Sequence, residues 1–182
     1  MRNYYTNKEE KQILKSMTIL VDTRENANKH ITDYFDSKKI EYKNKKLDYG
    51  DYSFMLPENK ELGILKPIFF DDEIVVERKN SLTELSGNLT KDRTRFEQEL
   101  IRKNGAKFHL MVEDGSWEMI EQQKYGTEYK PKSFIASLNA YIARYDLSID
   151  FIKKDHAGGF IARLFYYHLR EVMKNYVTDS VQ

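Results

Sequence analysis

Three carboxylates and one ammonium group in this sequence have the types and spacing for metal-assisted chemistry. Asp51 follows a glycine at the start of an expected strand, and Glu77 and Lys79 stand together near the end of another. Asp22 closes a short apolar run that also reads as a strand. Strand ends can meet at one edge of a sheet, and clustered carboxylate oxygens without His or Cys suit Mg²⁺ or Mn²⁺. We therefore take Asp22, Asp51 and Glu77 as candidate metal ligands.

The chemistry that fits this set is hydrolysis of a phosphodiester bond. A divalent ion held by Asp51 and Glu77 would polarise the phosphate and lower the pKa of the attacking water. Lys79 can orient that water and stabilise the developing charge. The predicted catalytic residues are therefore Asp51, Glu77 and Lys79. A plainer reading is that Glu77 and Lys79 are solvated or paired charges at a strand end, because Glu-x-Lys is common and most exposed ion pairs are structural.

The alternation of side chains along a strand separates the charges of the segment "EIVVERK". Glu77 and Lys79 share one face of the strand, and Arg78 points to the other face. We therefore expect Glu77 and Lys79 to face a site, and Arg78 to anchor neighbouring elements.

The elements that must position these residues alternate between strands and helices. Helices are expected where Thr6-x-x-Glu9 forms a capping box, after Ser116, and where Pro131 starts an apolar stripe. Thr90 is expected to cap a helix that reaches Lys103. Expected strands cover 19–22, 40–49, 51–56, 73–79, 107–113 and 147–152, and expected helices cover 28–39, 81–89, 90–103, 116–123, 131–145 and 155–176.

This order predicts an α/β fold in which helices flank one mixed sheet. A length of 182 residues suits one well-packed domain. We expect an N-terminal helical extension over 1–16, the main domain over 17–177 and a tail over 178–182. The apolar stripe of the last helix is wide, so it is either core or the face of a homodimer.

Composition narrows the classes of partner. There are 30 Lys and Arg against 29 Asp and Glu, so any nucleic-acid surface must be a local patch. The absence of Cys excludes disulfides, zinc held by Cys and thiol catalysis. Apolar runs long enough to span a membrane and a signal-peptide core are both missing, so a cytoplasmic protein is expected.

Three segments, "LVDTRE", "GDYSF" and "VVERKNSL", resemble in this order the XPF-type nuclease domain of the PD-(D/E)xK superfamily. Its pattern G-D…E-R-K-x-x-x-D falls here on Gly50-Asp51 and on Glu77-Arg78-Lys79. The similarity covers roughly residues 17–175 and extends to stand-alone bacteriophage members, which would place the protein in a bacterial host cell. It implies a restriction-endonuclease-like fold and a divalent-metal-dependent endonuclease that acts on branched or flapped DNA.

The resemblance also assigns the first motif. Asp22, Arg24 and Glu25 match it, so Arg24 is expected to hold a phosphate and Glu25 either to support the site or to form a structural salt bridge. Arg78 is a motif residue without an assigned chemical role.

The sequence departs from the family pattern at its end. Thr83 stands where the pattern has Asp, and the adjacent Glu84 completes a capping box with Ser81. We expect Glu84 to be a helix cap first and a substitute carboxylate second. Neither a helix-hairpin-helix module nor a helicase segment is expected in these 182 residues. Thr83 leaves an alternative open, in which the chain is a catalytically weakened DNA-binding or protein-interaction module on the same fold.

Basic residues follow the motif on the next expected helix. With Arg24, the candidate DNA contacts are Lys91, Arg93 and Arg95, although such runs are usually solvated faces. A second basic cluster spans 38–46. The four histidines show no metal-ligand spacing and are expected to be structural.

Overall fold

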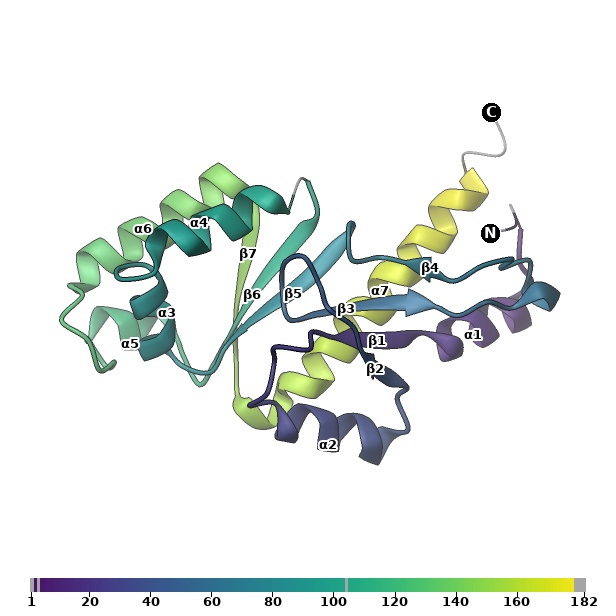
Figure 1. Cartoon of the computed structure of the whole chain (residues 1–182), viewed down its shortest axis with the longest axis horizontal. Coiled ribbons are helices and arrows are strands. Elements are labelled where there is room, and N and C mark those ends of the chain that lie inside the picture. Colours follow the sequence, from purple (N-terminus) through teal and green to yellow (C-terminus); the bar gives the residue numbers. More distant parts are fainter. Residues whose placement is uncertain (1, 3, 104, 179–182) are drawn as a thin grey trace.

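A mixed seven-stranded sheet forms the centre of the computed structural model, which describes residues 2, 4–103 and 105–178, with side chains through Lys174 (Figure 1). The strand order is β2-β1-β3-β5-β6-β7, and β4 pairs with β3 outside this path. β1 runs parallel to β2 and antiparallel to β3, whereas β5, β6 and β7 are parallel to one another. The strands are β1 (Thr18–Val21), β2 (Tyr42–Asn44), β3 (Tyr52–Leu56), β4 (Ile68–Phe69), β5 (Ile74–Lys79), β6 (Lys107–Glu113) and β7 (Leu147–Ile152).

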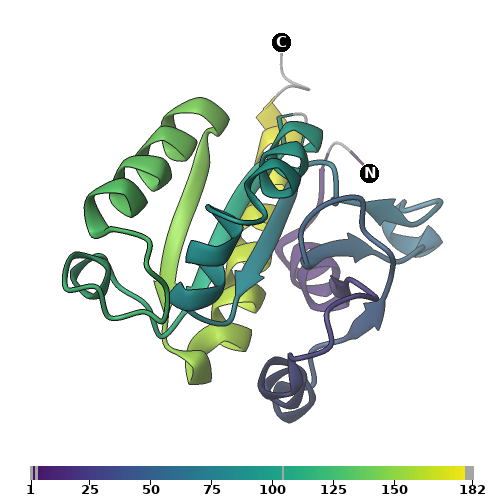
Figure 2. The same cartoon turned by 60° about the vertical axis from the view of Figure 1, so that its left-hand side comes forward.

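Helices cover both faces of this sheet, as expected for an α/β fold. Figure 2 shows β5 and β6 between α4 in front and α7 behind. The helices are α1 (Asn7–Ser16), α2 (Lys29–Lys38), α3 (Leu82–Asn88), α4 (Arg93–Arg102), α5 (Trp117–Glu121), α6 (Pro131–Tyr145) and α7 (Ala157–Thr178), with 3₁₀ turns η1 (Lys60–Leu62) and η2 (Lys154–His156). No helix in the described ranges is both long enough and apolar enough to cross a membrane.

Strand β5 divides the interior into two hydrophobic cores because its side chains alternate. Ile74 and Val76 pack into one core with α1, α2 and α7, and Val75 packs into the other with α3 to α6. Burying a large aliphatic or aromatic side chain contributes about 1.5–3 kcal/mol, so these two layers hold β5 firmly from both sides. The residues on β5 that carry charge therefore project from a rigid element.

Local signals account for most helix starts. The capping box of Thr6 and Glu9 at α1 is confirmed, and the Ser116 hydroxyl accepts a hydrogen bond from the Met119 N–H at the start of α5. Pro131 begins α6 as expected. In α7, the residues that point inward are core, as Ile161 and Phe165 are fully buried.

Several boundaries differ from those expected. Helix α3 lies within the expected range 81–89, but the Thr90 hydroxyl donates to the Ser86 carbonyl instead of capping α4. Helix α4 begins at Arg93, after Asp92. The expected strand over 40–49 shortens to β2, because the Leu47 N–H donates to a side-chain carboxylate instead of a neighbouring strand. Of the expected tail, residues 179–182 lie outside the described residues.

Candidate active site

A polar cavity of about 420 Å³ opens where the start of β3, the end of β5 and helix α4 meet. Four cationic and three carboxylate side chains line it, beside one amide and one aromatic ring. Asp51, Glu77 and Lys79 are therefore brought together, as the sequence predicts. The lining residues are Arg24, Gly50, Asp51, Glu77, Lys79, Asn88, Arg95, Phe96, Glu99 and Arg102.

Gly50 and the backbone of β5 fix the position of Asp51. Gly50 has φ +71°, and a Cβ at this position would lie 2.8 Å from the Cβ of Val75, so the turn requires glycine. The Asp51 N–H donates to the Val76 carbonyl at 2.8 Å, and Asp51 Oδ2 accepts from the Arg78 N–H at 2.7 Å. The Asp51 carboxylate is thus attached to the same strand that carries Glu77.

Glu77 and Lys79 form a buried pair on one face of β5. Lys79 Nζ lies 2.5 Å from Glu77 Oε1 and 5.3 Å from the centroid of the Phe96 ring. Both side chains are more than nine-tenths buried. A buried pair of this kind is costly to desolvate. Of the plainer reading, solvated charges are therefore wrong, whereas a pair between Glu77 and Lys79 is what the structure shows.

The electrostatics of the cavity favour protonation of its carboxylates. Burial, followed by the charges of Glu25 and Glu99, raises the pKa of Asp51 to about 7 despite the Arg78 N–H. Burial and the charge of Asp51 raise the pKa of Glu77 well above its usual range. Burial alone would lower the pKa of Lys79, but the charge of Glu77 raises it overall. The two buried carboxylates are therefore costly to ionise side by side, and a cation bound between them would relieve that cost.

Arg78 points to the opposite face of β5, as alternation predicts. Its Nε and Nη2 donate to the two oxygens of Glu113 at 2.7 and 2.9 Å, and its Nη1 donates to Glu25 at 2.9 Å. His30 Nε2 lies 2.6 Å from Glu113 Oε1, which connects α2 to β6. Arg78 thus anchors neighbouring elements, and Glu25 takes the structural salt bridge.

Asp22 lies beside this cavity but does not line it. The Arg24 side chain donates to both of its oxygens, at 2.7 and 3.0 Å, and the N–H of Leu47 donates at 2.7 Å. Burial raises the pKa of the Asp22 carboxyl, but these hydrogen bonds lower it by more, so the pKa is lowered overall. The expected convergence of three named carboxylates is therefore reduced to Asp51 and Glu77, and Asp22 holds Arg24 at the rim of the cavity.

Thr83 and Glu84 also point elsewhere. The Thr83 hydroxyl accepts from the Gly126 N–H at 2.9 Å, away from the cavity. Glu84 Oε2 accepts from the Asn80 N–H at 2.8 Å, and the Glu84 N–H donates to the Ser81 hydroxyl at 3.2 Å. Ser81 therefore caps α3 as expected, but the reciprocal bond of a capping box is not formed, since the Glu84 carboxylate accepts from Asn80 and not from Ser81. Glu84 Oε1 also lies 4.0 Å from Lys79 Nζ.

The sequence interpretation missed Glu99 and Asn88. Glu99 Oε1 accepts from the Gly50 N–H at 3.1 Å, so a third carboxylate does reach the site from α4. Arg95, Glu99 and Arg102 follow the i, i+4, i+7 spacing of one helical face, and this spacing was the available signal. Asn88 gave no such signal, because only the packing of α3 turns it toward the cavity.

The donor set fits a hard divalent cation. Asp51 Oδ1 and Glu77 Oε2 have no hydrogen-bond partner among the described residues. Asn88 Oδ1 is buried and also lacks a partner there, which is unusual for a buried polar atom. In the described ranges, no group of three or more His, Cys, Asp or Glu is arranged to hold a metal ion. A bound ion would therefore use Asp51 and Glu77, with water completing its coordination.

The candidate DNA contacts divide into two groups. Arg24 and Arg95 line the cavity, whereas Lys91 lines a separate cavity beside Gly87 and Gly126. Arg93 pairs with Glu97 and lies over the Tyr141 ring. His30, His109 and His168 pair with carboxylates on different elements, and His156 is exposed on η2. His109 and His168 also line one cavity beside α7.

Comparison with known proteins places this geometry in a family. A family model described as "ERCC4 domain" matches residues 21–164. XPF from Aeropyrum pernix is 19% identical with a TM-score of 0.59, covering 83% of this chain and 61% of that one. XPF from Aeropyrum pernix in complex with DNA is 18% identical with a TM-score of 0.61, covering 85% and 66%. This chain thus spans less than two thirds of either protein, and the likeness confirms the expected fold. No curated protein sequence matches the chain.

Proposed function

Because the chain belongs to the ERCC4 domain family, a family of DNA nucleases, we propose that it is a divalent-metal-dependent endonuclease that hydrolyses phosphodiester bonds in branched or flapped DNA. The observation that supports this most directly is the pair of carboxylates, Asp51 and Glu77, held beside Lys79 in a cavity with three arginines at its rim. The proposed nuclease domain covers residues 17–177, with 1–16 as an extension.

In the proposed mechanism, Asp51 and Glu77 hold one Mg²⁺ or Mn²⁺ ion. When bound, the ion polarises the scissile phosphate and lowers the pKa of the attacking water. With Glu77 holding an ion, Lys79 would be able to donate to the water or to a phosphate oxygen. Phe96 keeps Lys79 in place through the contact of its ring with the ammonium group.

The arginines of the cavity position the substrate in this proposal. Arg24, Arg95 and Arg102 are exposed at the rim and can bind phosphates on either side of the scissile bond. Arg24 is pre-oriented because Asp22 holds its guanidinium through two hydrogen bonds. Lys91 lines a separate cavity and Arg93 contacts Glu97 and Tyr141, so as DNA contacts these two residues remain predictions.

The test is cleavage of a labelled flap substrate with Mg²⁺ or Mn²⁺, against the same mixture with a chelator. We expect Glu77→Gln to abolish cleavage while binding of the substrate in chelator stays unchanged. Asp155→Asn, a change of the same kind at an exposed carboxylate on η2, should cleave normally. Full metal-dependent activity in Glu77→Gln would refute the assignment.

A second candidate function is a DNA-binding module on the same fold with weakened turnover. It is motivated by Thr83, whose hydroxyl is bonded to Gly126 and leaves the family's final carboxylate unmatched in the cavity. Metal-independent binding to several branched substrates without any cleavage would favour this candidate.

Two further expectations remain proposals. A homodimer could use the half-buried apolar residues of α7, such as Phe160 and Leu164, and light scattering at high concentration would measure its mass. The lack of Cys suits a reducing compartment such as the cytoplasm.

A further inference from the structure

A second cationic cavity lies on the face of the sheet opposite the candidate active site. It has a volume of about 650 Å³ and opens where α1, the end of α2 and α7 meet (Figure 1). We call it the lysine cleft and define it by its five cations, which are Lys11, Lys15, Lys38, Lys39 and Arg163.

The charges of the lysine cleft are exposed and unbalanced. Within the described part of the chain, none of its five cations forms an ion pair, and Glu41 is the one carboxylate that lines it. Lys8 extends the same surface, because Lys8, Lys11 and Lys15 recur at the spacing of one helical face. Like charges gathered without partners repel one another, so an anion that binds here gains affinity.

The floor of the cleft is apolar and aromatic. Leu14 and Met17 are buried beneath the lysines, and Tyr34 and Tyr166 line the walls. The Tyr166 side chain is 38% exposed and packs edge-on against Tyr167, with ring centroids 5.4 Å apart. An exposed tyrosine ring fixed in this way is a platform on which a nucleobase can stack.

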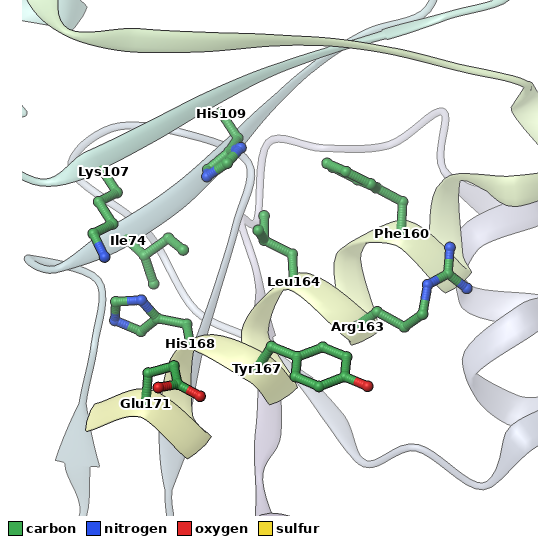
Figure 3. A pocket seen from close by; sticks show the side chains of 9 residues that line it. All are labelled: Ile74, Lys107, His109, Phe160, Arg163, Leu164, Tyr167, His168 and Glu171. Carbon is green, nitrogen blue, oxygen red and sulfur yellow. The ribbon is translucent and has the colours of Figure 1, made fainter. Parts of the chain in front are cut away.

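Arg163 joins the lysine cleft to a neighbouring cavity of about 490 Å³ along α7. Figure 3 shows that the Arg163 side chain points away from Lys107 and His168, which lie at the far end of this second cavity. Tyr167 lies between them and is 54% exposed. Cationic and aromatic side chains therefore continue along α7 beyond the lysine cleft.

We propose that the lysine cleft binds a single-stranded segment of nucleic acid, with phosphates on the lysines and a base against Tyr166. This inference rests on the proposed function in one respect, since it takes the ligand to be a strand of the DNA substrate. A single strand fits better than a duplex because its bases are free to reach the apolar floor. Lys11 and Lys15 are on α1, before the residues that match the family model, whereas the other three cations lie within those residues, so α1 adds to the matched domain to complete the cleft.

Other occupants fit the charges less well. A second copy of this chain in a two-fold interface would place the same lysines close to each other, which is unfavourable. An acidic peptide would satisfy the lysines but would leave Tyr166 without a stacking partner.

The test is fluorescence anisotropy of a labelled oligo-dT strand in chelator, so that binding is measured without cleavage. The variant Lys11→Gln/Lys15→Gln/Lys38→Gln removes three charges, and Tyr166→Ala removes the ring. The matched control is Lys124→Gln/Lys130→Gln/Lys132→Gln, which removes three exposed charges near the start of α6.

The two variants should differ in their dependence on salt. The triple lysine variant should bind on the order of tenfold more weakly at 0.1 M salt, and the slope of log K against log salt should fall by about 2. Tyr166→Ala should bind about fivefold more weakly with an unchanged slope, because no charge is lost. The control should retain most of the wild-type affinity.

Three results would overturn the inference. The first is that the triple lysine variant binds oligo-dT with wild-type affinity. The second is that this variant loses affinity for a blunt duplex as much as for the single strand. The third is that it loses binding of poly-glutamate while its binding of oligo-dT is intact. If oligo-dT binding is lost as expected while flap cleavage is never observed in the wild type, the binding site stands and the proposed nuclease activity fails.

Discussion

Replacing Asp51 with Asn should stabilise the metal-free protein at pH 8. Burial and nearby carboxylates raise the pKa of Asp51 from 3.8 to about 7, so the folded state holds this proton more tightly than the unfolded state does. Ionised Asp51 therefore destabilises the folded state. This destabilisation is absent below about pH 4, grows as the pH rises toward 7, and is complete above that. At 1.36 kcal/mol per pKa unit, the ionised group costs the fold up to about 4 kcal/mol.

Asparagine removes this cost and keeps the local geometry. Its amide oxygen can still accept from the Arg78 N–H, which donates to Asp51 Oδ2 at 2.7 Å in the wild type. We therefore expect the variant to exceed the wild type in the free energy of unfolding at pH 8 in chelator, and to match it near pH 4. Urea unfolding at both pH values measures this difference.

Added metal should narrow this difference. Ligand at 100 times its dissociation constant stabilises the state that binds it by about 2.7 kcal/mol. We expect Mn²⁺ to raise the unfolding free energy of the wild type at pH 8 and to leave Asp51→Asn unchanged. Asp155→Asn is the control and should behave like the wild type in both series. A less stable Asp51→Asn variant at pH 8 in chelator would refute the reasoning.

Three further changes test the scaffold of the site. Arg78→Met leaves the buried Glu113 carboxylate without its arginine partner and with His30 alone beside it. It should lower the unfolding free energy by about 3–5 kcal/mol in urea titration, whereas a neutral result would mean that the pair is not buried in solution. Gly50→Ala should cost at least about 1–2 kcal/mol because its φ is positive, and it should weaken Mn²⁺ binding in calorimetry; unchanged binding would contradict the proposed turn. Thr83→Asp should leave Mn²⁺ affinity unchanged, since this side chain faces Gly126, and a clear gain in affinity would show that position 83 reaches the metal.

The sequence determined the parts of the fold that depend on short-range patterns. Alternation along β5 placed Glu77 and Lys79 on one face and Arg78 on the other, because successive strand residues always point to opposite sides. The capping-box patterns at Thr6 and Ser81 marked helix starts for an equally local reason, since a hydroxyl reaches only the N–H groups of the next turn.

Tertiary packing decided which charged groups share the cavity. Asp22 and Asp51 both lie at strand ends, but the side-chain oxygens of Asp22 are taken by Arg24 and by Leu47, which lies 25 positions further along the chain than Asp22. Glu99 enters instead, because the packing of α4 against β5 brings its carboxylate to the N–H of Gly50.

The lysine cleft also combines features that the sequence shows with features that only the packing shows. The sequence displays the lysines of α1 and α2 as two ordinary charged runs, since periodicity describes one element at a time. Only the packing of both helices against α7 joins them around Tyr166. The sequence by itself therefore determined which face of β5 carries Glu77 and Lys79. The tertiary structure decided their partners and the second cavity, because contacts between distant elements depend on how whole helices pack against the sheet.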